Sequence, residues 1–125
     1  QLVKGILGGN STAVFRGLAN VYKKAGKTDA QQNNKNLILS PSARVNSIPQ
    51  LEIYEDDVKC SHGSTTGQIE EEALFYLQSR GIKRTDAMEL MVRGFANEVV
   101  DKVENQDMKE YIQNALIQKM EGMVQ

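Results

Sequence analysis

The sequence predicts a mainly β protein with an added α part: a strand-rich first half followed by a helical second half. Three observations predict this class. Short β-favouring runs recur up to about Ser61, turn-forming residues separate them, and the spacing of apolar residues changes from a period of 2 to 3.6 near Gly63 to Gly67. We therefore expect two domains, residues 1-66 and residues 67-125.

The β-favouring runs of the first half are residues 2–3, 5–7, 13–15, 37–39 and 51–54. Turn signals separate them at residues 8–10, 31–34 and 40–41, and we expect a loop from Gly63 to Gly67. Periodicity alone fits a meander, a sandwich or a β-solenoid. The modest strand length and the Asn-rich corner at Asn33, Asn34 and Asn36 favour the solenoid.

Three amphipathic helices are predicted in the second half. The first covers about residues 68–80, with Glu70, Glu71 and Glu72 in its first turn and Gly81 just past its end. The second follows Thr85 as the N-cap, and Asn105 or Asp107 caps the third. We expect their apolar stripes to pack against one another, namely Ala87, Leu90, Met91, Gly94, Phe95 and Val99, and then Met108, Tyr111, Ile112, Ala115, Leu116 and Met120.

Composition narrows the function class. The 15 basic and 16 acidic residues leave a net charge of −1, which gives no long-range attraction to nucleic acid or to an anionic membrane. No apolar run approaches the roughly 18 residues that span a bilayer. One cysteine cannot form an internal disulfide, so we expect a cytoplasmic protein. The chain opens on Gln1 in a strand-like run, and we expect it to be a segment of a longer protein.

The strongest candidate site is the pair Cys60 and His62, the one cysteine and the one histidine of the chain. On a strand, residues two apart share a face, so Val58, Cys60 and His62 would project to the same side. The thiolate of Cys60 and the imidazole of His62 could then act as ligands for zinc or iron. Two ligands do not complete a site, and the others must come from another chain. Two alternatives stay open: a small buried Cys60 beside a turn residue His62, or, less favoured, a Cys–His nucleophile.

The stretch PQLEIYEDDVKCSHG at residues 49–63, followed by Thr65, Gly67 and residues 71–77 and 79–82, closely resembles the SufB/SufD family of iron–sulfur cluster assembly scaffolds. The run at residues 58–63, and the lack of cysteine at residues 42–46, resemble the SufD branch most. The resemblance implies a right-handed parallel β-helix (β-solenoid) segment followed by a C-terminal α-helical domain. It also implies a non-catalytic subunit of a SufBCD complex.

The resemblance further implies a place for each part of the chain. The β-helix would pair with a SufB-like subunit, and the helices within residues 68–100 would bind a SufC-like ABC ATPase. His62 would face the nascent cluster together with ligands from the partner subunit, with Cys60 beside it. We expect no tightly bound cofactor in this chain, only a transient cluster in the full complex, and self-association of an isolated fragment. The competing hypothesis is a metal-independent β-solenoid interaction module.

Overall fold

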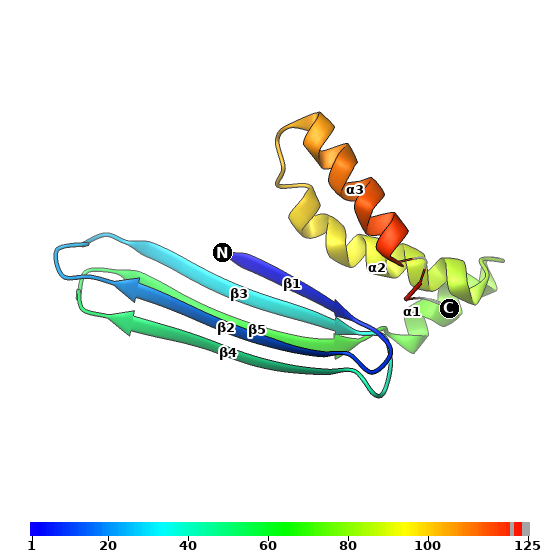
Figure 1. The fold of residues 1–125 in the computed structure, drawn as a ribbon, viewed down its shortest axis with the longest axis horizontal. Coiled ribbons are helices and arrows are strands. Elements are labelled where there is room, and N and C mark those ends of the chain that lie inside the picture. The colour runs from blue at the N-terminus through cyan, green and yellow to red at the C-terminus, as the bar shows by residue number, and fades with distance from the viewer. Residues whose placement is uncertain (121, 124–125) are drawn as a thin grey trace.

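The computed structural model describes residues 1–120 and 122–123, so residues 121 and 124–125 of the expected helical region lie outside the described residues. The described chain has five strands followed by three helices (Figure 1). The strands are β1 (Leu2–Leu7), β2 (Thr12–Val21), β3 (Asp29–Ile38), β4 (Arg44–Ile53) and β5 (Lys59–Gln68). The helices are α1 (Glu71–Ser79), α2 (Arg84–Val100) and α3 (Gln106–Met120). The predicted mixed class, strands first and helices after, is confirmed.

The strands form two parallel sheets. Sheet A has the order β1-β3-β5, and sheet B consists of β2 and β4. Successive strands of the chain therefore alternate between the sheets, and each strand pairs with the strand two positions further along. The register is unbroken: Leu2 pairs with Asn33, and Asn33 pairs in turn with Gly63. In Figure 1 the two sheets run side by side along the long axis of the molecule.

Two turn predictions in the β region are wrong. The expected corner at residues 31–34 lies inside β3, and the expected loop from Gly63 to Gly67 lies inside β5. Both segments gain a complete ladder of backbone pairs with a neighbouring strand, which outweighs the turn preference of Asn and Gly. The strands are accordingly longer than the short runs of β-favouring residues from which they were predicted.

The helix boundaries agree with the sequence except at one cap and at the start of the first helix, which was expected at about residue 68 but begins at Glu71 because β5 continues to Gln68. Gly81 follows α1 with a φ of 88°, and the Asn105 side chain accepts a hydrogen bond from the Met108 backbone N–H at 2.9 Å, as a helix cap does. The predicted N-cap at Thr85 is wrong, because Lys83 occupies that position. The helix begins earlier, at Arg84, whose guanidinium binds both carboxylate oxygens of Glu71 at 2.9 and 3.1 Å.

The predicted apolar contacts between helices are only partly present. α2 buries Ala87, Val92, Ala96 and Val100, and α3 buries Met120. Of the predicted stripes only Ala87 and Met120 are among these buried residues, whereas Leu90 at 53%, Val99 at 36%, Met108 at 52% and Tyr111 at 70% are exposed, as is Gly94. Ala115 is exposed as well. The reason is the layout of the helices: α2 packs on α1, α3 and the sheet, while α3 lies on the far side of α2 from the strands (Figure 1).

Candidate functional site

The two candidate ligands lie on β5, the outermost strand of sheet A. β5 pairs with β3 along one edge, and no strand among the described residues pairs with its other edge. In this register Cys60 pairs with Ala30 and His62 pairs with Gln32. The two positions share a face of the strand, as predicted, about 6.6 Å apart along it. Cys60 is half-buried and His62 is exposed, and the alternative that makes His62 a turn residue is wrong.

The face that carries His62 is the inner face of sheet A, which is directed toward sheet B. Along β3 this face carries Gln32, Asn34 and Asn36, all buried. The Asn34 side-chain oxygen Oδ1 accepts hydrogen bonds from the Asn36 side-chain nitrogen Nδ2 and from the Ser47 hydroxyl of sheet B, both at 2.7 Å. Buried polar groups persist when they are hydrogen-bonded, and here the amides of Asn34 and Asn36 bond to each other. This polar interior was missed by the sequence analysis, and the signal available was the alternation of amides at 32, 34 and 36.

The exposure of His62 follows from the number of strands in each sheet. Sheet A has three strands and sheet B has two, so within the described part of the chain β5 has no following strand of sheet B to cover its inner face. Buried Gln32, Asn34 and Asn36 on β3 are therefore followed on β5 by exposed His62 and its neighbours. The inner face of sheet A is therefore buried along β3 but exposed to solvent along β5.

The described residues supply only two ligand atoms here. No group of three or more His, Cys, Asp and Glu residues in the described ranges is placed to hold a metal ion. Two of the three nearby carboxylates join the ends of the strands: Glu55 accepts a hydrogen bond from the Lys24 backbone N–H at 2.7 Å, and Asp57 forms an ion pair with Lys27 at 3.4 Å. A thiol and an imidazole can therefore bind iron or zinc firmly only with ligands from outside this set.

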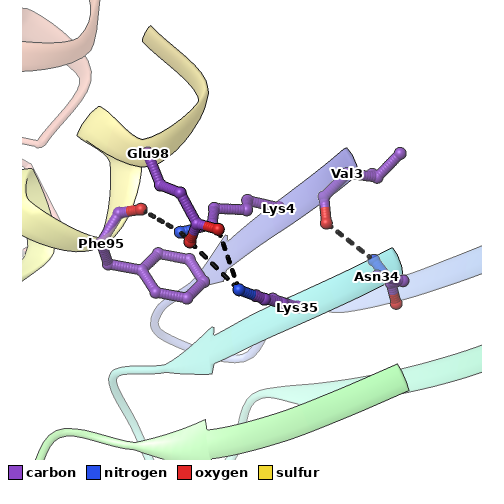
Figure 2. Close-up of polar contacts among 6 residues, drawn as sticks. All are labelled: Val3, Lys4, Asn34, Lys35, Phe95 and Glu98. Atoms are coloured by element: carbon purple, nitrogen blue, oxygen red, sulfur yellow. Dashed lines mark hydrogen bonds and ion pairs between the residues drawn. The ribbon is translucent and has the colours of Figure 1, made fainter. Parts of the chain in front are cut away.

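The opposite, outer face of sheet A holds the helices (Figure 2). The Lys4 side chain is only 6% exposed and forms an ion pair with Glu98 of α2. The Lys4 ammonium also donates to the Phe95 carbonyl oxygen at 2.5 Å and lies 4.2 Å from the centre of the Phe95 ring. Lys35 of β3 reaches the same carboxylate at 2.9 and 3.2 Å. Hydrogen bonds from Lys4 and Lys35 lower the pKa of Glu98 from 4.5 to about 2.

The first two helices leave large apolar side chains on the surface. Phe75 and Tyr76 of α1 are 73% and 57% exposed, and Leu90 of α2 is 53% exposed.

Among the described helices, none is both long and apolar enough to cross a membrane.

Comparison with known proteins identifies relatives of this chain. The family model described as "SUF system FeS cluster assembly, SufBD core domain" matches residues 1–95. The chain is 44% identical over 122 residues to the iron-sulfur cluster assembly protein SufD of Escherichia coli, covering 98% of this chain and 29% of that protein. It is 47% identical over 103 residues to an iron-sulfur cluster assembly SufBD family protein of Synechocystis, covering 82% of this chain and 23% of the relative. It is 31% identical over 119 residues to SufD of Bacillus subtilis, covering 95% and 27%. The chain thus spans less than a third of the length of these relatives.

Proposed function

The chain belongs to the SufBD family of iron–sulfur cluster assembly proteins, and from this premise we propose that it is part of a SufD-like scaffold subunit. In this proposal the protein assists cluster assembly without catalysing a reaction itself, inside a SufBCD-type complex. The cluster is cargo that is built on the complex and leaves it. The relatives are iron–sulfur cluster assembly proteins by name, which supports cluster assembly as the process in which this chain takes part. The geometry of the chain supports separate roles for the strands and for the helices.

We propose that the strands are the last coils of a right-handed parallel β-helix, with the helices as a separate domain. The alternation of successive strands between two parallel sheets supports a solenoid, since a solenoid chain visits each of its sheets once per coil. A longer protein would place further coils before β1, where the register of Leu2 with Asn33 leaves the other edge of β1 for another strand. This arrangement makes β5 the strand at the exposed end.

The observation that carries the proposed function is the exposed His62 on the inner face of β5, which pairs with β3 on one edge and with no other described strand on its second edge. An imidazole there, with Cys60 on the same face, offers ligands to a cluster whose other ligands come from a SufB-like subunit docked against β5. The free strand edge supports this docking, because its unpaired backbone N–H and C=O groups can pair with a strand of another chain. Reducing conditions, as in the cytoplasm, would keep Cys60 a thiol.

The test is reconstitution with iron and sulfide. The full-length protein is purified with its SufB-like and SufC-like partners, and cluster content is measured by absorbance and by iron and sulfide analysis. His62→Ala is expected to lower cluster content severalfold, while the complex keeps its size on a sizing column. Ser64→Ala is the matched control, since Ser64 is an exposed residue on the same face of β5. Equal cluster content in all three complexes would refute the role of His62.

A SufC-like ATPase would dock on the helices of residues 68–100. The exposed Phe75, Tyr76 and Leu90 support this part of the proposal, because α1 and α2 each leave large apolar side chains on the surface. This surface and the inner face of β5 belong to different elements. Docking of the ATPase and cluster chemistry are therefore expected to respond to different substitutions.

A second candidate function is a metal-independent interaction module in which β5 pairs only with another protein. The observation that favours it is the presence of just two ligand atoms beside a free strand edge in the described residues. Under this function, His62→Ala leaves reconstituted cluster content unchanged, whereas substituting proline for Thr65 in the middle of β5 disrupts pairing with the partner subunit. The reconstitution experiment therefore separates the two candidates.

A further inference from the structure

Gln32 has an unusual position in the polar interior of sheet A. Its side chain is buried, with the residue 4% exposed. Its Nε2 donates a hydrogen bond to the Gln1 side-chain oxygen at 2.8 Å, which orients the amide. Its Oε1 is fully buried and has no hydrogen-bond partner among residues 1–120 and 122–123. Native proteins rarely leave a buried carbonyl oxygen without a hydrogen bond, so we expect a donor to approach Gln32 Oε1.

The amide of Gln32 is confined by the opposite sheet. A Cβ atom added to Gly17 of β2 would lie 2.5 Å from Gln32 Oε1 and 2.6 Å from Nε2, far inside van der Waals contact. Only a glycine leaves room for the amide at this point. The Gln32 amide therefore packs against Gly17 of sheet B, while its nitrogen is hydrogen-bonded to Gln1.

On the adjacent strand β5, the residue paired with Gln32 is His62. The two residues are paired in the register of β3 and β5, and paired residues of a parallel sheet direct their side chains to the same face. Adjacent strands lie about 4.8 Å apart, which brings an imidazole N–H on β5 within reach of an amide oxygen on β3. His62 is also the one histidine of the chain, and an imidazole N–H is a good donor.

We propose that Gln32 is a positioning residue for His62: when the exposed imidazole turns toward β3, Gln32 Oε1, which has no partner among the described residues in this structure, accepts a hydrogen bond from one ring nitrogen. This contact selects a single tautomer and leaves the lone pair of the other ring nitrogen directed away from the sheet interior. Histidines that bind metals commonly donate their second ring N–H to a carbonyl or carboxylate in this way. The importance of the contact for cluster assembly rests on the proposed function, whereas the contact itself belongs to this chain alone.

The test is nuclear magnetic resonance on the ¹⁵N-labelled chain, at a pH where the imidazole is neutral. Because the chain has one histidine, its two ring nitrogens are read without assignment ambiguity. One tautomer is expected to dominate in the unaltered chain. Gln32→Met, which keeps the length and removes the acceptor, is expected to lower the ratio of the two tautomers about fivefold, the effect of one net hydrogen bond. Gln32→Glu, which retains an acceptor, is expected to keep the dominant tautomer, and Ser64→Ala is the control that leaves the ratio unchanged.

Two results would overturn the proposal. The first is an unaltered chain in which the two ring nitrogens have averaged shifts like those of an exposed free imidazole, and this result needs no variant to fold. The second is a folded Gln32→Met chain, verified by its backbone amide spectrum, with the same tautomer ratio as the parent. Neither measurement depends on cluster content, so loss of the proposed function in the reconstitution experiment and loss of this contact are told apart.

Discussion

Replacing Asn34 with alanine tests whether the polar interior of the two sheets stabilises the protein. Asn34 is 2% exposed and lies between β1, β4 and its own strand. Its carbonyl oxygen accepts the two short hydrogen bonds from Asn36 and Ser47, each 2.7 Å long. Its amide nitrogen reaches the Val3 carbonyl oxygen at 3.5 Å, a contact drawn in Figure 2. The one side chain therefore connects sheet A to sheet B.

The expected cost follows from these contacts. Each short hydrogen bond contributes about 1 kcal/mol net, so alanine loses about 2 kcal/mol from the pair. The Asn36 side chain is buried, so leaving its amide without this short partner costs about 1 kcal/mol more, whereas the Ser47 hydroxyl is only half-buried. The free energy of unfolding should fall by about 3 kcal/mol, a large share of the roughly 5–15 kcal/mol of a typical domain. Removing Asn34 is costly because the buried Asn36 amide cannot replace this hydrogen bond with one to water.

Urea unfolding followed by circular dichroism measures this loss. With a urea slope of about 1–2 kcal/mol per molar, the midpoint should fall by about 1.5–3 M. Asn33→Ala is the matched control: Asn33 is the preceding residue of β3, has the same side chain, and is exposed. We expect this control to change the free energy of unfolding by less than about 0.5 kcal/mol.

Two results would refute the reasoning. One is an equal midpoint for Asn34→Ala and Asn33→Ala. The other is a double-mutant cycle of Asn34→Ala with Ser47→Ala that gives a coupling energy near zero, since residues sharing a hydrogen bond should couple by at least about 0.5 kcal/mol. Either result would mean that the amides of β3 contribute little beyond filling space.

Three further predictions concern other parts of the molecule. The pKa of Glu98 is lowered from 4.5 to about 2, so its stabilising effect is complete above pH 4.5 and is lost as the pH falls toward 2; the difference in Tm between the parent and Glu98→Gln should therefore shrink across this range, while Glu110→Gln should show no such trend. Isothermal titration of the isolated monomeric chain with zinc or ferrous ion should give no tight, stoichiometric binding, because Cys60 and His62 supply at most two ligands, and one tightly held ion per monomer would contradict this. In pull-downs from the full complex, Phe75→Ser should weaken capture of the SufC-like ATPase at least severalfold while His62→Ala leaves it intact, and loss of capture with His62→Ala would make His62 a docking or folding residue.

The order of the elements and the candidate pair could be predicted from the sequence for a local reason. A change of apolar period from 2 to 3.6 follows directly from the geometry of strands and helices, so strands up to about Ser61 and helices from about residue 68 were predicted from the chain. The structure extends the last strand to Gln68 and begins the first helix at Glu71. The common face of Cys60 and His62 follows from the same period of 2. Caps formed by nearby residues, such as Asn105, were visible in the same way, because their hydrogen bonds span only a few residues.

What only the tertiary structure decided depends on contacts between distant residues. Gln32, Asn34 and Asn36 read as a turn because isolated amides favour turns, yet the hydroxyl of Ser47 and the amides of the same strand make them a buried interior.

The exposure of individual residues was decided in the same way. Leu90 and Tyr111 were predicted to be core residues because helical spacing cannot show which face of a helix a neighbour covers. In the structure no neighbouring element among the described residues buries either side chain, and both are exposed. By itself the sequence determined which residues share a face of a strand or helix. The pairing of β5 with β3, together with a sheet B that ends at β4, determined that the face with His62 is open while the face with Gln32 is buried, because burial depends on which distant segment packs against a face.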